Sequence, residues 1–518
     1  MLNLKLMLET VAGQHPQKTA IISGEQKLTY AELDTAANKV ANALLKIGVR
    51  RGDRVAILLT NSPEFVATYF GAIKAGSIPI PLDIRYKAGE LAPIFDNCRP
   101  KVLVAESLLL EPLISALPGF DFIEHVIELD SQYEGQFLSY REITAAGSPQ
   151  AVDLSLDPED IATISYGGGP SNHPRGAALS HSGLLTEAIV AGDGFQQTGE
   201  DIMMLFALPM YHMFGLGSVL LPTLYRGGTV VVVPGTGRSI SSLLEAIEKE
   251  KGTIWLGVPY IFSLAINVAR REGIKSDLSS LRLCVSAGAT LSVELIRQFK
   301  QSYGFTLVDV WGLTESVSHI TCPPIDGTWE PGSTGKALPG WEIKAVDDAG
   351  KDLPVNQPGE IVVRGPMMKG FFNNPQTTAE VIRDGWLYTG DLGRVDADGY
   401  LFLTGRKKNM IILKGQNIYP GDIEEVLSTH SKMAKAVVVG IPDSLRGETV
   451  AAAILLKEGE TATEQEIRRF CQERMSDYKV PKHIIFTNSL SDYDTSKIDK
   501  ESLQKQILPL FSPESPPH

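Results

Sequence analysis

The chain has 518 residues, of which 43% are hydrophobic and 21% are charged, with 48 basic and 61 acidic side chains. This length predicts about three or four compact units of about 150 residues each, enough for deep cores. The net charge of −13 argues against a nucleic-acid-binding protein, because contact with phosphates requires a basic face. An anionic small ligand stays compatible with this charge, since a cleft can be locally positive on an acidic protein.

The cysteines and the apolar segments indicate a cellular compartment. Four scattered cysteines show no C-x-x-C spacing, so they predict neither a zinc site nor a disulfide scaffold. The segment Met1–Ala20 lacks the apolar run of a signal peptide, and no apolar stretch approaches the roughly 20 residues that cross a bilayer. We therefore expect a soluble cytoplasmic protein with no transmembrane segment.

In the first two-thirds of the chain, a short apolar strand, a turn marked by Gly or Pro and an amphipathic helix recur. Arg54–Thr60 is predicted to be a buried strand, and Ser62 and Pro63 are typical of the start of a helix that ends at Gly76. This alternation predicts an α/β fold with mostly parallel sheets covered on both faces. Further strands are predicted at Val102–Ala105, Ile161–Tyr166, Thr229–Val233, Leu281–Ser286 and Leu307–Trp311.

The pattern changes after about Gly405, where short helices and strands are mixed. A capping box at Thr463 and Glu466 opens one of these helices, which is predicted to run through Met475. We predict a large N-terminal domain over residues 1–405 and a small, mobile α+β C-terminal domain over residues 406–518. The other elements predicted in the small domain are a helix at Gly421–His430 and strands at Ala434–Gly440, Thr449–Leu456 and His483–Thr487.

A glycine-rich loop is the first candidate site. Ile164–His181 predicts a strand, a loop containing Gly167, Gly168 and Gly169, and then the start of a helix. Glycines let backbone N–H groups converge on a phosphate, a helix N-terminus adds a positive end, and Arg175 adds a fixed cation. An ordinary strand-to-helix turn is the alternative, because the loop matches neither the Walker pattern nor the dinucleotide fingerprint.

The second candidate is Val308–Ser316, a predicted strand that leads into Gly312, Thr314 and Glu315. Parallel sheets bind ligands beyond the carboxyl ends of their strands, which is where these residues are predicted to lie. There Trp311 can cover a purine face and Glu315 can hold a hard cation such as Mg²⁺ through oxygen. A solvated glutamate after a core strand is the alternative interpretation.

Three later segments carry further candidates. Asp391 lies in a Thr-Gly-Asp sequence that predicts a tight turn, where a carboxylate can accept both hydroxyls of a ribose. Arg406 follows a predicted hairpin, and Gly415 interrupts a strand pattern, which suggests close approach of the backbone to a ligand. Lys497 lies in a polar Thr-Ser-Lys segment and by itself reads as a solvated lysine.

Taken in order, these motifs resemble the adenylate-forming superfamily of acyl-CoA synthetases, peptide-synthetase adenylation domains and beetle luciferases. The resemblance extends from the Leu-Thr-Tyr-Ala-Glu-Leu sequence at Leu28 to the Lys-Ile-Asp-Lys sequence at Lys497. Intermediate matches are Leu208–His212, Trp311–Glu315, Tyr388–Asp391 and Gly405–Lys408. The resemblance implies that a carboxylic acid and ATP form an acyl-adenylate, whose acyl group then passes to a thiol.

The resemblance also implies a role for each candidate residue. Lys497 bridges the acid carboxylate and the α-phosphate, Thr314 contacts the α-phosphate, and Glu315 holds Mg²⁺. Trp311 and Gly312 stand where the adenine is usually bound, and Asp391 and Arg406 hold the ribose. The glycine loop, with Gly167, Gly168, Gly169, Ser171 and Arg175, binds the phosphates, and His212 lies at the acid. Lys408 matches a hinge about which the small domain rotates, and Gly415 lines the thiol tunnel.

The glycine loop departs from the family pattern T-S-G-T-T-G-x-P-K-G. Three hydroxyl positions become Gly167, Gly168 and Pro170, Ser171 keeps its hydroxyl, and Arg175 replaces lysine. The extra glycines preserve a backbone cradle for an anion, whereas Pro170 removes one N–H donor. This departure puts efficient handling of pyrophosphate in question.

The leading expectation is an AMP-forming acid–CoA ligase that uses ATP, Mg²⁺ and CoA on a fatty or aromatic monocarboxylic acid. The Lys-Val-Pro sequence at Lys479, after Tyr478, resembles CoA ligases more than peptide-synthetase modules. The alternatives are a free-standing ligase that loads an acyl-carrier protein, and a degenerate relative that only binds ligands. The sequence leaves the oligomeric state open between monomer and homodimer.

Overall fold

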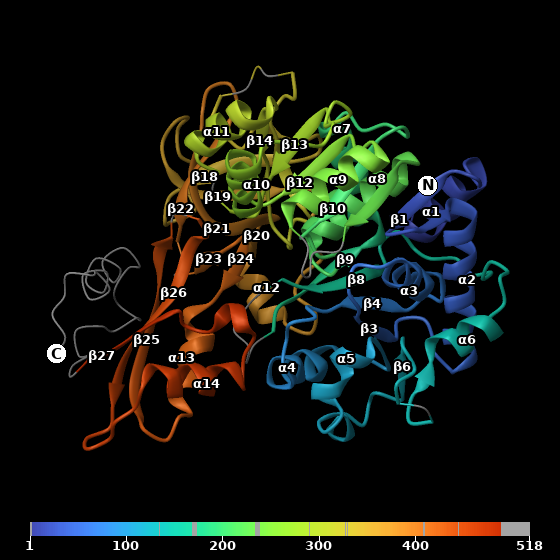
Figure 1. Ribbon diagram of the computed structural model, residues 1–518, viewed down its shortest axis with the longest axis horizontal. Helices are drawn as coiled ribbons and strands as arrows, with labels where there is room; N and C mark the ends of the chain where they lie inside the picture. Colours follow the sequence, from blue (N-terminus) through green and yellow to red (C-terminus); the bar gives the residue numbers. More distant parts are fainter. Residues whose placement is uncertain are drawn as a thin grey trace. The chain divides into compact units, whose positions relative to one another are not determined.

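The computed structural model describes residues 3–133, 135–167, 174–233, 239–289, 291–326, 328, 330–407, 410–443 and 445–487. The chain forms two compact units, and Figure 1 shows the helices and strands of each. The large unit comprises residues 1–84, 94–167 and 175–404, and the small unit comprises residues 85–93, 168–174 and 405–518. Each unit has a hydrophobic core of its own.

A seven-stranded sheet with the strand order β14-β13-β12-β10-β11-β1-β2 organises the large unit. All its pairings are parallel except that of β2 with β1, so its central strands are apolar on both faces. The strands are β1 (Thr19–Ser23), β2 (Gln26–Thr29), β10 (Ile202–Phe206), β11 (Thr229–Val233), β12 (Ile254–Gly257), β13 (Leu283–Ser286) and β14 (Leu307–Asp309). In the chain, α7 (His181–Gly194) precedes β10, and α8 (Leu221–Arg226), α9 (Ile240–Glu250), α10 (Pro259–Glu272) and α11 (Val293–Tyr303) lie between the strands from β10 to β14.

A second sheet of the large unit is parallel throughout, with the order β4-β3-β5-β6-β7. Its strands are β3 (Arg54–Leu58), β4 (Ile78–Pro81), β5 (Val102–Ala105), β6 (His125–Glu128) and β7 (Leu138–Ser139). The helices of this region are α1 (Leu4–Gln14), α2 (Tyr30–Lys46), α3 (Pro63–Lys74), α4 (Ala88–Cys98), α5 (Ser107–Leu110) and α6 (Tyr140–Ala146). Both sheets confirm the predicted α/β class.

Helix starts in this region follow the sequence signals. The Thr29 hydroxyl and the Glu32 carboxylate form a reciprocal capping box at α2, and Ser62 caps α3 with Pro63 in its first turn. Helices α1, α2 and α3 are joined by the fully buried Lys74 ammonium, which donates to Glu9, Asp34 and Asn38 at 2.7–3.0 Å. Charges placed so deep are retained because each is paired.

The glycine-rich segment differs from its prediction. β8 (Ile161–Tyr166) is followed by a second strand, β9 (Gly176–Ser180), and the two pair antiparallel. Helix α7 begins only at His181, so the glycine loop joins two strands of a hairpin and does not lead directly into a helix. The sequence predicts the start of a helix in this segment, but all five residues of β9 are buried, as expected of a strand covered on both faces.

The remaining strands of the large unit form antiparallel sheets. One has the order β18-β19-β21-β20 with β22 paired to β21, and a three-stranded sheet has the order β15-β16-β17. A β-turn at Asp398 and Gly399 joins β21 to β22, as the sequence predicts. The elements are β15 (Trp311–Gly312), β16 (His319–Cys322), β17 (Lys336–Ala337), β18 (Glu342–Val346), β19 (Gly359–Arg364), α12 (Pro375–Val381), β20 (Ile382–Arg383), β21 (Trp386–Val395) and β22 (Leu401–Arg406).

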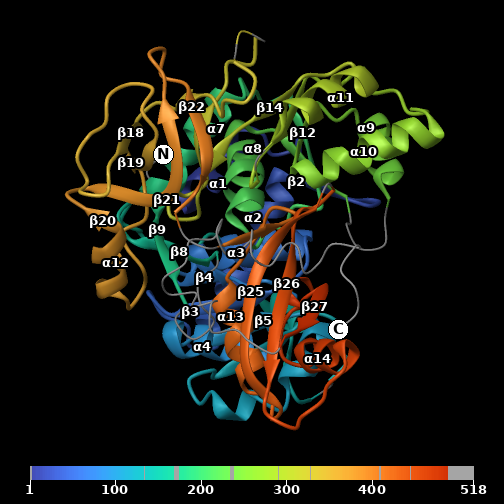
Figure 2. The ribbon, with the colours of Figure 1, turned by 90° about the vertical axis from the view of Figure 1, so that its left-hand side faces the viewer.

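The small unit is built on an antiparallel sheet with the order β24-β23-β26-β25, to which β27 adds in parallel with β26. Figure 2 shows β25 and β26 as long neighbouring strands. The mixed α+β character agrees with the prediction. The elements are β23 (Ile411–Leu413), β24 (Gln416–Ile418), α13 (Pro420–Ser428), β25 (Met433–Asp443), β26 (Gly447–Leu456), α14 (Glu464–Gln472) and β27 (His483–Phe486).

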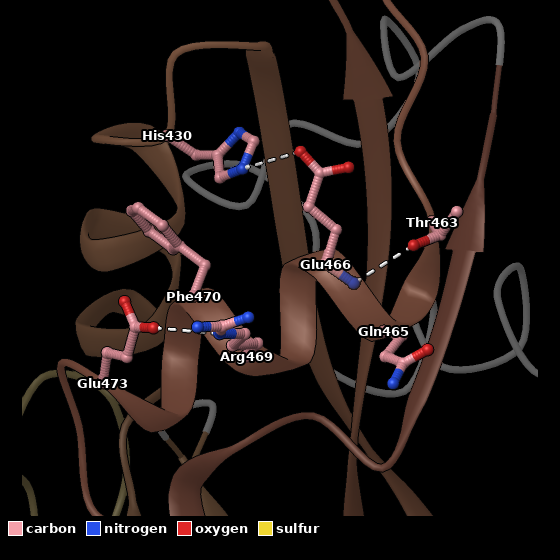
Figure 3. Close-up of a pocket in the computed structure, with 7 residues that line it drawn as sticks. All are labelled: His430, Thr463, Gln465, Glu466, Arg469, Phe470 and Glu473. Carbon is pink, nitrogen blue, oxygen red and sulfur yellow. Dashed lines mark hydrogen bonds and ion pairs between the residues drawn. The ribbon is translucent and has the colours of Figure 1, made fainter.

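A hollow of about 420 Å³ lies along α14 (Figure 3). Several of its polar side chains form contacts within the helix: the Thr463 hydroxyl accepts a hydrogen bond from the Glu466 amide, and Arg469 forms an ion pair with Glu473. The ring of His430 lies 3.7 Å from Glu466 and packs edge-on against Phe470. None of the residues singled out in the sequence as a ligand site lines this hollow.

All four cysteines are buried and unpaired, so no disulfide scaffold is present. Among the described residues, no helix is both long and apolar enough to cross a bilayer.

Candidate functional site

Gly167, the first residue of the glycine loop, lies directly against Thr314. A Cβ added at Gly167 would overlap the side chain of Thr314, so this position admits no side chain while Thr314 stays in place. On the other side of the loop, the Arg175 guanidinium lies 5.9 Å from the centre of the Phe371 ring. Gly167 and the Thr314–Glu315 turn are thus neighbours, as a shared phosphate site requires. Gly168, Gly169, Pro170 and Ser171 lie outside the described residues.

The segment before Thr314 is two strands and not one. β14 ends at Asp309, and Trp311 and Gly312 form β15, which pairs antiparallel with β16. The chain changes sheet at Val310, whose amide still donates to Ser286 in the parallel sheet. The sequence conceals this change, because the residues from Leu307 to Trp311 are buried in both sheets. The site residues therefore follow the carboxyl end of β14 by a few positions, where parallel sheets bind ligands.

The Leu313–Ser318 turn is held by the hydroxyl of Ser316. That hydroxyl accepts from the Leu313 amide at 2.9 Å and lies within hydrogen-bond distance of the Leu313 and Ser318 carbonyl oxygens. The Met368 amide also donates to the carbonyl of Glu315 at 2.8 Å. Val317, next to Ser316, has a φ of 72° although it is β-branched, which is a strained conformation.

Trp311 and Asp391 form a buried pair. The Trp311 indole Nε1–H donates to the Asp391 carboxylate at 2.8 Å, and the two residues are 6% and 2% exposed. The sequence suggested separate contacts for these residues, an adenine face and a ribose. The structure brings them together from β15 and β21, so each fixes the orientation of the other.

Asp391 is not in a tight turn, as the sequence predicted, but in the middle of β21. The pairing of β21 with β19 shifts register between Tyr388 and Leu392, so Thr389, Gly390 and Asp391 form a bulge. Gly390 has a φ of 73°, the Thr389 hydroxyl donates to the Ile361 carbonyl, and the Asp391 amide donates to that hydroxyl at 3.1 Å. A bulge and a turn share the same residue preferences, and only the strand pairing separates them.

His212 precedes a π-helix, η3 (Phe214–Leu220). Its ring Nδ1 accepts from the Phe214 amide at 3.2 Å, which leaves Nε2 to carry the proton of the neutral ring. A Cβ at Gly215 would overlap the Pro209 carbonyl, so the helix starts by folding tightly on the segment before it. π-Helical turns occur often at functional sites.

Sequence reasoning missed a buried polar group behind the Thr314–Glu315 turn. His319 is 2% exposed, Glu187 and Ser218 are fully buried, and they come from β16, α7 and η3. Burial lowers the pKa of His319 to about 3, so its ring is neutral near pH 7, and burial raises the pKa of Glu187 well above its usual value. The one sign of this group in the sequence is a glutamate, Glu187, within the apolar part of α7, and the sequence does not indicate its contact with His319.

In the small unit, Arg406 is the last residue of β22, and one of its guanidinium nitrogens lies 3.6 Å from the Met410 sulfur. Gly415 occupies the two-residue turn of the β23–β24 hairpin, where Lys414 and Gly415 have φ values of 53° and 82°. A primed hairpin turn explains why a glycine stands here, and the predicted approach of its backbone to a ligand stays a prediction. Lys408 and Lys497 lie outside the described residues.

The donor set fits a magnesium ion held mainly by its nucleotide. The Glu315 carboxylate and Thr314 hydroxyl are hard oxygen donors on one turn, and Mg²⁺ is usually bound by one or two carboxylates plus substrate phosphates. Among the described residues, no group of three His, Cys, Asp or Glu side chains forms a metal cage. A cage is not needed for a metal that arrives with ATP.

His181, the first residue of α7, provides a pH-dependent test of this region. It is 3% exposed, and burial lowers its pKa to about 4. Below its unfolded pKa of about 6.5 the unfolded chain binds the proton more readily, so the native state is destabilised as the pH falls. Relative to His181→Gln, the wild-type protein is expected to lose about 2 kcal/mol of unfolding free energy between pH 7 and pH 5.

Urea unfolding of the two proteins at pH 7 and pH 5, followed by tryptophan fluorescence, measures this difference. Other titrating groups, including Glu187, are common to both proteins and cancel in the comparison. A stability difference that does not change with pH would contradict the buried, neutral state of His181.

Comparison with known proteins decides the family. The profile described as AMP-binding enzyme matches residues 8–372, and that of the AMP-binding enzyme C-terminal domain matches residues 422–497. The chain belongs to the AMP-binding enzyme family. This confirms the resemblance to the adenylate-forming superfamily and the acyl-CoA synthetase type.

Full-length relatives of this AMP-binding enzyme include two CoA ligases. It is 33% identical to the indoleacetate–CoA ligase of Aromatoleum aromaticum, over 98% of each chain. It is 31% identical to the long-chain-fatty-acid–CoA ligase of Bacillus subtilis, over 97% of this chain and 94% of the relative. The structure of the amide bond synthetase McbA from Marinactinospora thermotolerans matches with a TM-score of 0.87 and 26% identity, over 96% of this chain and 99% of that one. The predicted enzyme class, an AMP-forming acid–thiol ligase, is confirmed.

Proposed function

We propose that this enzyme joins a fatty or aromatic monocarboxylic acid to CoA in two steps. An acid carboxylate oxygen attacks the α-phosphorus of ATP, the bond to pyrophosphate breaks, and an acyl-adenylate forms. The CoA sulfur then attacks the acyl carbon, and the bond to AMP breaks. The observation that carries the proposal is the packing of the glycine loop at Gly167 against Thr314, next to Glu315.

The chain's side chains serve the first step by neutralising and aligning two anions, because positioning and electrostatics dominate such reactions. In this proposal Lys497 bridges the carboxylate and the α-phosphate, and Thr314 donates to the α-phosphate. Glu315 holds Mg²⁺, which when bound neutralises phosphate charge. Asp391, held by Trp311 at 2.8 Å, accepts hydrogen bonds from the ribose hydroxyls, and Arg406 donates to the ribose oxygens.

The glycine loop binds the β- and γ-phosphates in this proposal, through its backbone N–H groups and Arg175. Restoring the family's hydroxyl at Gly167 is not a neutral change, since any side chain there meets Thr314. We infer that the loop uses backbone donors where relatives use hydroxyls, and that Gly167 lets it approach the Thr314 turn.

The acid pocket is proposed near His212, at the carboxyl ends of neighbouring parallel strands. Gly257 ends β12, Ser286 ends β13, and these two residues are paired in register. The run of small side chains continues through Ala287, which is buried. Small residues at strand ends leave room for an acyl chain or ring, and the named activities of the two relatives, on indoleacetate and on long-chain fatty acids, span both.

Two alternatives to this function can be distinguished by the same experiment. The acceptor can be the pantetheine of an acyl-carrier protein, which presents the same thiol as CoA. The altered glycine loop can also leave a protein that binds ligands but turns over slowly. We further propose a cytoplasmic location, where ATP and CoA are available.

Acid-dependent exchange of labelled pyrophosphate into ATP tests the first step with a panel of fatty, aryl and arylacetic acids. Mass spectrometry of products formed with CoA, an acyl-carrier protein or a simple amine then identifies the acceptor. The amine is included because one structural match is an amide bond synthetase. Exchange followed by acyl-CoA formation is expected. Pyrophosphate exchange without any acyl-CoA product would reject CoA as the acceptor. No exchange with any acid would favour a protein that binds ligands without activating an acid.

A further inference from the structure

The buried polar group behind the Thr314–Glu315 turn joins three elements of the large unit. The Ser218 hydroxyl of η3 lies 2.9 Å from Nδ1 of His319 and also bonds the Ser318 hydroxyl. The Glu187 carboxylate of α7 accepts from the His319 amide at 3.0 Å and lies 3.5 Å from its Nδ1. These contacts converge on the residues that directly follow the turn.

Two glycines let the backbones meet where this group lies. A Cβ at Gly217 of η3 would come within 3.0 Å of the Val317 carbonyl oxygen and of the Ser318 Cβ. A Cβ at Gly312 would overlap the Ser318 carbonyl on the other side of the turn. The Leu313–Ser318 turn is therefore enclosed between η3 and its own strand β15, with no space for an intervening side chain.

The Leu313–Ser318 turn contains a residue with a strained backbone. Val317 is fully buried with a φ of 72°, and a β-branched residue in that region persists only where its surroundings over-determine it. Ser316 supplies bonds from inside the turn, and Ser218 supplies them from η3 through Ser318 and His319. His319 also stacks on Phe195 with ring centres 5.0 Å apart.

We propose that Ser218, His319 and Glu187 are positioning residues that hold the Thr314–Glu315 turn against η3, and thereby couple the helix that follows His212 to the phosphate-binding turn. The inference rests on the proposed function, because it assigns these residues to adenylate formation. They touch no substrate themselves. They act by fixing the strained Val317 backbone, and with it the direction in which Thr314 and Glu315 project.

The test compares two serine substitutions of the same kind. Ser218→Ala removes the bridging hydroxyl, and Ser107→Ala removes an equally buried hydroxyl that donates to Glu128 at 2.6 Å between α5 and β6. We expect Ser218→Ala to lower kcat for pyrophosphate exchange about tenfold, with KM for ATP changed less than about twofold. Thioester formation from supplied acyl-adenylate is expected to change little, and Ser107→Ala to change neither half-reaction.

Hydrogen exchange measured by mass spectrometry gives a readout that does not depend on the acid. Ser218→Ala should accelerate amide exchange at Leu313–Ser318, whereas Ser107→Ala should leave that segment protected. If the wild type supports no pyrophosphate exchange but the turn is deprotected only in Ser218→Ala, the proposed function fails and the positioning role stands. Wild-type protection of the turn in a folded Ser218→Ala protein would overturn the positioning role.

Glu187 supplies the second pair of variants if Ser218→Ala does not fold. Glu187→Gln keeps a neutral acceptor for the His319 amide, and Glu187→Leu removes it. The glutamine variant is expected to retain at least half of the wild-type exchange rate. The exchange rate of the leucine variant is expected to be about tenfold lower than that of the wild type. Equal rates in the two variants would contradict the role of this acceptor.

Discussion

Replacing Lys497 with alanine is expected to abolish adenylate formation while sparing the transfer of the acyl group from a supplied acyl-adenylate. The ammonium is needed only where the acid carboxylate and the α-phosphate converge, so its loss removes a contact of the first transition state. Removing one such electrostatic contact typically lowers kcat by about 10²–10³-fold. Pyrophosphate exchange and thioester formation, measured separately, report the two half-reactions.

Lys500→Ala is the matched control for Lys497→Ala, because it removes the same charge three positions later in the same segment. It is expected to leave both half-reactions within about twofold of wild type, because the proposed function assigns Lys500 no contact with the acid carboxylate or the α-phosphate. A loss of similar size in both half-reactions of Lys497→Ala would remove the assigned role.

Replacing Asp391 with alanine is expected to raise KM for ATP by about 30-fold or more. The substitution removes the ribose acceptor and leaves the Trp311 indole N–H, now bonded at 2.8 Å, without a partner in a buried site. Losing a charge-assisted hydrogen bond and leaving its donor unsatisfied together cost about 2–3 kcal/mol. ATP dependence of pyrophosphate exchange at saturating acid measures the change.

Asp391→Asn separates the two contributions to this loss. The amide oxygen can still accept from the Trp311 indole, whereas the charged acceptor for the ribose is gone. We expect a KM for ATP between those of the wild type and Asp391→Ala. An Asp391→Ala enzyme with unchanged KM for ATP would show that this carboxylate only supports Trp311 and does not bind the nucleotide.

Local sequence signals were sufficient for the fold class and for many element positions. β5 and β11 coincide with their predicted runs, and α2 and α3 start at their capping residues, because strand burial and helix capping depend on neighbours in the chain. The ordered motifs also identified the family. The roles assigned to the site residues, among them Glu315, Asp391, Lys497, Arg406 and His212, stay predictions.

The α/β class and the family could therefore be predicted from the sequence alone. The fold was needed to show that the glycine loop joins two antiparallel strands, that Asp391 lies in a strand bulge and that it bonds Trp311. It alone brought Glu187, Ser218 and His319 together from α7, η3 and β16. The physical reason is that strand partners and buried polar contacts join residues about 10² positions apart, whereas propensity and patterning report only a few neighbours along the chain.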